Sequence, residues 1–248
     1  IISTMSIFLY NFFHNETNDR TEKGQIKISI DGKDHPKSWL TVEYKNYSLF
    51  EPIVLKREGS YFFNNLLSKR RSSEGYILGN KITLDKIGYI LQCGYGLQNN
   101  KEELRKENRT VPSGGKRYSL EVYVFLFKSI DNCAPGVYHY GIKDHVLEPV
   151  FYRDFTKDDI LSFTPQDWLQ ETNGMICITS IFDRTVRKYG SMGYRLILLE
   201  AGHIGQNILL AGTEKGINVI PIAGIYPEII EQMIGLGKGE RVVYTLFF

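Results

Sequence analysis

The strongest hydrophobic pattern in the chain lies in the second half of residues 184–216 and predicts a long helix. Apolar positions spread around most of its circumference, so we expect this helix to be largely buried. These positions are Leu196, Ile197, Leu199, Ala201, Ile204, Ile208, Leu209 and Ala211. Gly216 provides a natural stop, because glycine commonly ends helices in the left-handed conformation.

Lys188 and Tyr189 precede this helix. They lie between Arg187 and two glycines, Gly190 and Gly193, a pattern that predicts a loop entering the helix. Adjacent residues of a regular strand point to opposite faces and cannot serve one ligand together. A loop or a first helical turn can direct an ammonium and a phenol at the same substrate atom.

Shorter patterns predict further helices and strands in one α+β domain. Strands are expected at residues 26–30, 120–127, 137–140, 145–148, 175–182, 219–225 and 241–248, with 120–127 central in the sheet and 137–148 a hairpin. Helices are expected from Ser60 to about residue 69, from Leu84 to Gln92 behind a Thr83 cap, at 165–171, and after Pro227. The stripe Ile87, Ile90 and Leu91 should be buried.

Composition and charge describe a soluble globule. A net charge of +2 in 248 residues gives no support to binding of duplex nucleic acid or of a membrane surface. The cysteines Cys93, Cys133 and Cys177 are far apart, which favours buried thiols in a reducing cytoplasm. The histidines are scattered, so local spacing predicts no metal site. The apolar first 14 residues are shorter than a bilayer span and lack a cationic leader, so we expect a packed element there.

Three short motifs are candidates for chemistry, and each also has an ordinary structural explanation. Arg70, Arg71 and Ser72 follow a predicted helix end and suit a phosphate dianion, although cations there also complement the helix dipole. Residues 112–115, Pro-Ser-Gly-Gly, let backbone amides approach a planar or anionic ligand, although such turns are common. A surface Lys beside a Tyr, as at Lys188–Tyr189, usually has no catalytic role.

The order of the motifs is more specific than any one of them. The chain contains Arg70-Arg71-Ser72, Pro112-Ser113-Gly114-Gly115 before residues 120–123, Gly136 to Tyr140 with His145 and Leu147-Glu148, Lys188-Tyr189-Gly190, Gly193-Tyr194-Arg195, and Leu199 to His203 with Gln206-Asn207. This series resembles the nitroreductase-like flavoenzymes, and in combination the azoline dehydrogenases, which make thiazoles and oxazoles in modified peptides. Residues 13–17 and 36–55 resemble the family's N-terminal part.

The resemblance implies an α+β, nitroreductase-like fold: a central, mostly antiparallel sheet flanked by helices, with FMN at a homodimer interface. Residues 59–248 would form the FMN-binding domain and residues 1–58 an N-terminal arm or partner-contact region. The resemblance places Arg70, Arg71 and Ser72 at the flavin phosphate and ribityl end, and Pro112, Ser113, Gly114 and Gly115 along the isoalloxazine. Gln206 and Asn207 would either line the cofactor pocket or bond buried backbone groups. Lys188 and Tyr189 would be the catalytic pair.

The implied reaction oxidises a thiazoline or oxazoline ring of a precursor peptide to an azole. It needs a hydride acceptor, which is FMN, and a base, which is Lys188 or Tyr189. Amines and phenols have reference pKa values of about 10, so a base of either kind needs surroundings that favour its deprotonated form. Oxygen is the expected final acceptor and a cyclodehydratase the expected partner. Residues 39–50 are expected to wrap the second subunit or, as the alternative, to contact that partner.

Two other functions stay open at this level. The same scaffold would suit a reductase of dehydroamino acids, nitroaromatics or quinones with a nicotinamide donor. A flavin-free structural subunit of a peptide-modifying complex is the other alternative, although a scaffold needs neither Lys188 nor Tyr189. Lys116 and Arg117 stand where the family more often has small or apolar residues, and they leave the substrate preference open.

Overall fold

The computed structural model describes residues 11–15, 17, 44–45, 50–56, 61–72, 81–98, 108–237 and 239–248. The predicted strand at 26–30 and most of the predicted arm at 39–50 lie outside these residues. Tyr44 and Phe50, which belong to that arm and are described, are exposed. Within the described ranges, no helix combines the length and the apolar character needed to cross a bilayer.

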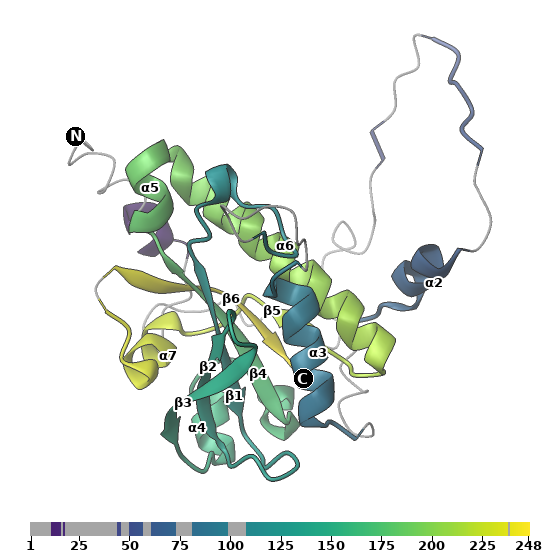
Figure 1. Cartoon of the computed structure of the whole chain (residues 1–248). Coiled ribbons are helices and arrows are strands. Elements are labelled where there is room, and N and C mark those ends of the chain that lie inside the picture. The colour runs from purple at the N-terminus through teal and green to yellow at the C-terminus, as the bar shows by residue number, and fades with distance from the viewer. Residues whose placement is uncertain are drawn as a thin grey trace, which may run out of the picture.

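A sheet of six strands, as far as the structure describes the chain, forms the centre of the fold (Figure 1). In spatial order the strands are β3 (Val146–Tyr152), β2 (Gly136–Gly141), β1 (Leu120–Leu126), β4 (Gly174–Ile181), β6 (Glu240–Phe247) and β5 (Ile220–Ile222). All five pairings are antiparallel. The predicted fold class, the central position of β1 and the β2–β3 hairpin are therefore confirmed.

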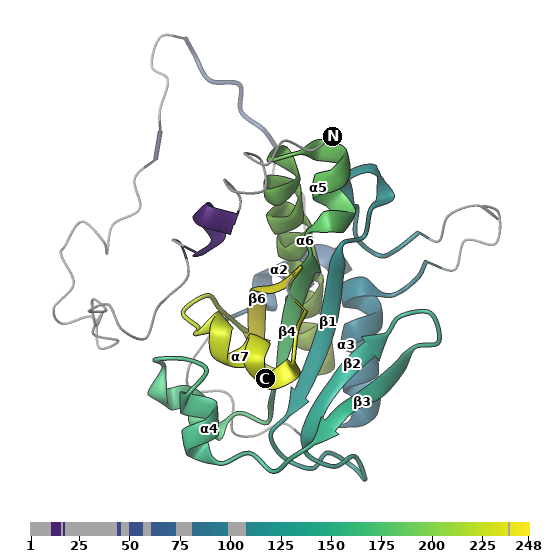
Figure 2. The same cartoon turned by 90° about the vertical axis from the view of Figure 1, so that its left-hand side faces the viewer.

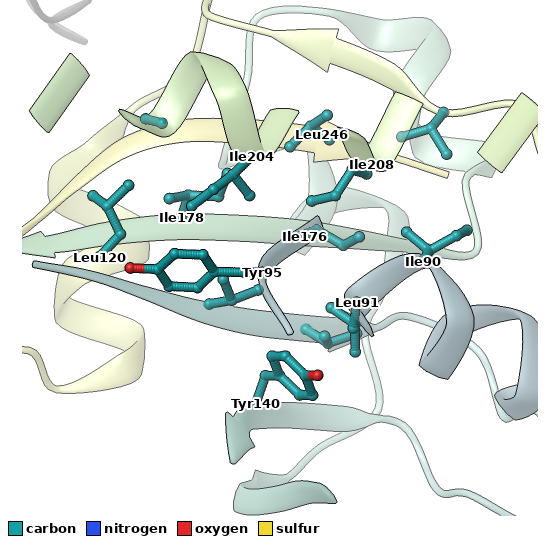
Figure 3. Packing of buried hydrophobic residues seen from close by; sticks show 14 of the residues in the cluster. Ile90, Leu91, Tyr95, Leu120, Tyr140, Ile176, Ile178, Ile204, Ile208 and Leu246 are labelled. Carbon is teal, nitrogen blue, oxygen red and sulfur yellow. The ribbon is translucent and has the colours of Figure 1, made fainter. Parts of the chain in front are cut away.

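Helices cover both faces of this sheet. The helices α3 (Leu84–Tyr95) and α6 (Met192–Lys215) pack together on one face, and α4 (Lys157–Leu161) and α7 (Pro227–Ile234) lie on the other, as Figure 2 shows for α3, α4 and α7. Because β1 and β4 are covered on both faces, their sequences are nearly continuous apolar runs. Figure 3 shows the larger core between α3, α6 and the sheet.

The helix α3 begins as the sequence predicts. Thr83 accepts a hydrogen bond from the backbone N–H of Lys86, and the stripe of Ile87, Ile90 and Leu91 is buried. The helix continues three residues past the predicted end, to Tyr95, because its last turn is covered by α6. A Cβ atom at Gly94 would lie 2.6 Å from Ile208 Cγ1, so this glycine lets the two helices approach closely.

The helix α6 differs from the prediction in the burial of one side. Its 24 residues end at Gly216 in the left-handed conformation, as predicted. Six of the eight apolar positions named from the sequence are buried and Leu196 is half-buried. Leu199 is 57% exposed, and so are its neighbours on the same helix, Met192 (61%) and Leu198, so the expected burial is confirmed except at these exposed residues. The sheet and α3 reach only one side of α6, and its opposite side carries apolar residues that nothing in the described chain covers.

Other predicted elements also change in extent. The helix α2 (Phe62–Lys69) follows Tyr61 and buries none of its residues, while the predicted start at Ser60 lies outside the described residues. Residues 167–171 form a 3-10 helix, and β5 has three residues instead of the predicted seven. The short α4 was not predicted. Cys177 is buried, but Cys93 and Cys133 are only half-buried, so the expectation of buried thiols is wrong for those two.

Lys188 and Tyr189 lie in a helix, not in the predicted loop. This helix, α5 (Asp183–Tyr189), buries only Thr185 and Val186, which is too few apolar positions for its sequence to show a helical period. At its start the helix meets the N-terminal segment, where residues 11–15 are helical and His14 is buried. His14 Nδ1 lies 3.2 Å from the Tyr194 hydroxyl, which confirms a packed element for the described part of the N-terminus.

A charged network joins α5 to the sheet. Glu121 of β1 forms an ion pair with Arg184 of α5, and its other oxygen lies 3.1 Å from His139 Nε2 on β2. His139 Nδ1 lies 2.8 Å from Glu148 on β3. The hydrogen bond with Glu121 raises the pKa of His139 to about 9, against the effect of burial, and the bond with Glu148 adds to the rise. The imidazolium therefore links two carboxylates at neutral pH.

This network predicts a pH-dependent contribution to stability. The pKa of His139 rises from 6.5 to about 9 on folding, so its contribution is fully present below pH 6.5 and is lost as the pH rises through 9. We expect His139→Gln to lower the free energy of unfolding by about 1–2 kcal/mol at pH 6, allowing for partial exposure, and by much less at pH 10. Urea unfolding at both pH values measures this. A deficit of the same size at pH 6 and pH 10 would contradict the assignment.

Candidate active site

The ends of two side chains converge on Gly115. A Cβ atom built there would lie 2.5 Å from the Tyr189 hydroxyl and 2.6 Å from Lys188 Nζ. The ammonium also lies 5.1 Å from the centre of the Tyr189 ring. Gly115 and Lys188 are exposed and Tyr189 is half-buried, so a ligand has access to all three. The structure thus brings together two of the predicted motifs, the Pro-Ser-Gly-Gly loop and the amine–phenol pair.

The position of α5 explains this convergence. Arg184 Nη1, in the first turn, donates to the backbone carbonyl of Tyr118 at 3.3 Å as well as pairing with Glu121. Arg117 Nε donates in turn to the carbonyl of Arg184 at 2.6 Å. These bonds hold α5 against both β1 and the loop of residues 112–118. The last turn of α5, with Lys188 and Tyr189, is thereby fixed next to Gly115.

The loop itself has an unusual backbone. Gly115, Lys116 and Tyr118 have φ values of +62°, +53° and +46°, all in the left-handed region. Glycine adopts this conformation freely, whereas a lysine or a tyrosine there is strained and persists only where the surroundings hold it. The loop therefore depends on contacts with the rest of the chain.

A buried carboxylate on α6 supplies the main contact. Ser113 Oγ donates to Glu200 Oε2 at 2.5 Å and accepts from the backbone N–H of Tyr118 at 2.9 Å. The Tyr95 hydroxyl donates to the other oxygen of Glu200 at 3.0 Å. Burial raises the pKa of Glu200, and the two hydrogen bonds oppose that rise. The Ser113 hydroxyl is therefore directed inward, and the loop offers its backbone, not this side chain, to a ligand.

Arg109 adds a positive charge behind the loop. Its guanidinium lies between two aromatic rings, 4.3 Å from the centre of Tyr95 and 4.7 Å from that of Tyr118. Arg109 also acts to lower the pKa of Glu200, which shows that it partly balances the buried charge. Its Nη1 atom is buried without a hydrogen-bond partner. The sequence assigned no role to Arg109 or to Glu200, although a glutamate among apolar helix positions is a visible signal of a buried polar contact.

The remaining predicted site residues are placed elsewhere. Asn207 Nδ2 donates to the backbone carbonyl of Cys93 at 3.2 Å, which agrees with the second of its two predicted roles, and Gln206 is exposed. Arg71 and Ser72 are exposed and Arg70 half-buried at the end of α2. Arg70 Nη1 donates to Ser72 Oγ at 3.1 Å, and Arg71 Nη1 donates to the carbonyl of Ser68 at 2.6 Å. In the described part of the chain, the hydrogen bonds of these three residues stay at the end of α2 and do not reach the loop.

A cavity of about 610 Å³ lies apart from this site, between α3 and the β2–β3 hairpin. It is lined near the first turn of α3 by Asp85 and Gly88 and from the hairpin by Tyr140 and His145, whereas Glu200 contacts the last turn of α3. Its volume alone does not indicate chemistry, and the Gly115 site is the better candidate. Among the described residues, no three metal-ligating side chains are grouped closely enough to hold an ion.

Comparisons with known proteins agree with this geometry. A family model described as the Nitroreductase family matches residues 67–248. Protein MJ1384 of Methanocaldococcus jannaschii, named for a nitroreductase, is 28% identical over 170 residues, which cover 68% of this chain and 82% of that protein. The trifolitoxin-processing protein TfxB of Rhizobium leguminosarum bv. trifolii is 27% identical over 187 residues, which cover 71% of this chain and 49% of TfxB. The chain thus spans about half the length of TfxB.

A solved structure shares the fold over almost the whole chain. It is a chain of the Escherichia coli microcin synthetase McbBCD complex with truncated pro-MccB17 bound. The TM-score is 0.75 at 20% sequence identity, and the match covers 98% of this chain and 92% of that one. At this level of identity the likeness shows the fold alone. The two chains therefore share the same arrangement of helices and strands over almost the whole of this chain.

Two left-handed glycines allow a matched test of the convergence at Gly115. An alanine costs about 1–2 kcal/mol of stability at either Gly115 or Gly216, because φ is +62° or +67°. At Gly216 the methyl group meets no atom within 4 Å, whereas at Gly115 it displaces the ends of Lys188 and Tyr189. We therefore expect urea unfolding to report similar losses, and NMR of labelled tyrosine to report a shift of the Tyr189 ring in Gly115→Ala alone. An unchanged Tyr189 signal in that variant would disprove the contact.

The Ser113–Glu200 hydrogen bond predicts a second pair of outcomes. Ser113→Ala removes the donor to a buried carboxylate and the acceptor for the Tyr118 N–H, so we expect a loss of about 1–3 kcal/mol in urea unfolding. Hydrogen exchange at the Tyr118 amide should accelerate as well. Ser191→Ala is the control, because Ser191 is exposed and its side chain caps nothing; we expect a change within about 0.5 kcal/mol. Equal effects of the two substitutions would mean that this bond does not hold the loop.

Proposed function

Because the chain belongs to the nitroreductase family of oxidoreductases, we propose that it is an FMN-dependent azoline dehydrogenase. It would oxidise thiazoline or oxazoline rings to azoles in a ribosomally made precursor peptide. The observation that carries this proposal is the convergence of the Lys188 amine and the Tyr189 hydroxyl on the backbone of Gly115. The similarity to TfxB, a trifolitoxin-processing protein, supports a peptide as the substrate, and the shared fold with the McbBCD chain is consistent with it.

The described residues fit FMN in their chemistry. Gly114 and Gly115 offer backbone without side chains, which suits the approach of a planar ring. Arg70 and Arg71 carry guanidiniums, which bind phosphate through paired, charge-assisted hydrogen bonds, with the Ser72 hydroxyl beside them. When bound, FMN supplies the acceptor for a hydride.

The glycines lie in the loop, whereas Arg70, Arg71 and Ser72 end α2, and their hydrogen bonds in the described chain do not reach the loop. A homodimer would allow the loop of one copy and the arginines of the other to hold the same FMN. The helix α2, which ends at the arginines, buries none of its residues and exposes Phe62 and Phe63 by 72% and 59%. The uncovered side of α6 exposes Met192 and Leu199. Apolar surfaces of this kind are typical of protein interfaces. We therefore propose that a second copy covers them and that FMN lies where the two copies meet.

In the proposed reaction the chain's own groups hold the ring and remove a proton. The loop at Gly114 and Gly115 supports the site from one side. Lys188 or Tyr189 takes the proton from a ring carbon, and the other member of the pair holds its orientation. The ion pair of Arg184 with Glu121 keeps α5 in place, so the base does not move away from the ring. Proton removal by a positioned base contributes roughly 10²- to 10⁴-fold to the rate of such steps.

Three further parts of the proposal concern partners, acceptor and domains. The shared fold with a chain of the microcin synthetase complex favours cyclodehydratase subunits as partners, because they would deliver the azoline. Oxygen is the proposed final electron acceptor. The proposed FMN-binding domain spans residues 59–248, close to the residues that the family model matches, and residues 1–58 form the proposed arm.

A reductase is the second candidate, and one observation favours it. MJ1384, which is named for a nitroreductase, matches over 82% of its own length, more than TfxB does. In that case the same site would pass electrons from a nicotinamide donor to a nitroaromatic, a quinone or a dehydroamino acid. No comparable observation favours a flavin-free structural subunit, for which the convergence at Gly115 would have no use.

The proposal predicts a separation of binding and turnover. We expect Lys188→Ala and Tyr189→Phe to purify as folded, yellow dimers and to oxidise an azoline peptide at least about 100-fold more slowly, because each removes a member of the proton-transfer pair. Lys143→Ala, in the exposed turn between β2 and β3, is the control and should keep the normal rate. Formation of the azole can be followed by mass spectrometry. A normal rate in either variant would show that its residue is not the base.

A further inference from the structure

Positive charge is concentrated around the Gly115 site. The loop of residues 113–118 and the helix α5 together carry five cations, Lys116, Arg117, Arg184, Arg187 and Lys188, and one carboxylate, Asp183. In the whole chain 30 basic and 28 acidic side chains nearly balance. This local excess is therefore a property of the site and not of the protein as a whole.

The acidic groups nearby are already paired. Asp183 lies 3.1 Å from Arg187, and Glu121 is shared between Arg184 and His139. Lys116 and Arg117 are exposed, and Arg117 is held across the first turn of α5 by its bond to the carbonyl of Arg184. These two exposed cations form a surface that we call the cationic rim, defined as Lys116 and Arg117.

We propose that the cationic rim binds acidic residues of the peptide next to the reacting ring. This inference rests on the proposed function, because a peptide whose ring lies at Gly115 must continue over the neighbouring surface. An extended chain advances by about 3.3 Å per residue, so the first two or three residues beside the ring reach Lys116 and Arg117. Carboxylates are the complementary groups, since a guanidinium binds them through paired hydrogen bonds. Charge of this kind selects among partners more than it adds total affinity.

The proposal can be tested with two azoline peptides that differ only in having Asp or Asn at the two residues before the ring. In the double variant Lys116→Asn, Arg117→Gln we expect KM for the Asp peptide to rise about 3- to 10-fold relative to KM for the Asn peptide, the range for a few exposed ion pairs. Loss of the Arg117 bond to α5 acts on both peptides alike and therefore cancels in this ratio. Asparagine is chosen at residue 116 because it tolerates the left-handed backbone. Arg117→Lys keeps the charge, and Lys143→Gln removes a distant one, so both should keep the wild-type preference for the Asp peptide. Equal changes in KM for both peptides would overturn the proposal.

A binding assay separates this inference from the proposed function. Fluorescence anisotropy of labelled peptides that lack the azoline, measured with the purified full chain, should show tighter binding of the Asp peptide than of the Asn peptide at low salt. The preference should disappear in 0.5 M salt, an ionic strength at which exposed charges are screened beyond about 5 Å, and in the double variant. If that preference holds while azoline oxidation is absent, the rim stands and the proposed function fails. If neither peptide is preferred and the protein sediments with phosphatidylserine vesicles, the rim is a membrane contact and the proposal is overturned.

Discussion

The hydrogen bond between Ser113 and Glu200 is the constraint on which the candidate site depends. A buried carboxylate is costly unless donors satisfy it, and Glu200 has two, from the loop and from α3. Meeting that requirement joins the loop, α3 and α6 into one unit behind the site. Gly115 lies two residues beyond Ser113, so the position of the glycine backbone follows from the position of a carboxylate on the long helix. The left-handed residues Lys116 and Tyr118 lie in the same loop, and the Tyr118 N–H donates to the Ser113 hydroxyl that bonds Glu200.

The opposite side of the site is set by a second, more exposed group of charges. Arg184 joins α5 to β1 and to the loop, and His139 extends the connection across β2 to β3. The amine and the phenol are therefore carried by a short helix that is fixed at its first turn. The same arrangement concentrates cations at the surface next to the site. The charged contacts that fix α5 thus hold the proposed catalytic pair in place and also bring together the cations of the rim, whose charge would select the substrate.

Much of the fold follows from the sequence, whereas the centre of the site does not. The strands β1 and β4 are long apolar runs, and Thr83 and Gly216 mark helix ends by local chemistry. These two strands and two helix ends can therefore be predicted from the sequence alone. The helix α5 was missed because its two buried residues are too few to show a helical repeat in the sequence. The exposed side of α6 was missed because an apolar residue does not reveal in the sequence whether this chain or another one covers it. The role of Glu200 depends on Ser113 and Tyr95, which are distant in the sequence and meet only in the folded chain. The motifs at 112–115 and 188–189 were found as separate candidates, and the structure adds that they meet at Gly115.

The central claim is that a flavin at this site takes electrons from an azoline ring. A visible absorption spectrum of the purified protein, recorded without oxygen before and after addition of an azoline peptide, tests it most directly. The account predicts a yellow protein whose flavin band is bleached in proportion to the peptide added and returns when oxygen is admitted. A flavin band that the azoline peptide leaves unchanged, and that reduced nicotinamide bleaches at once, would contradict the account and assign the chain to the reductases.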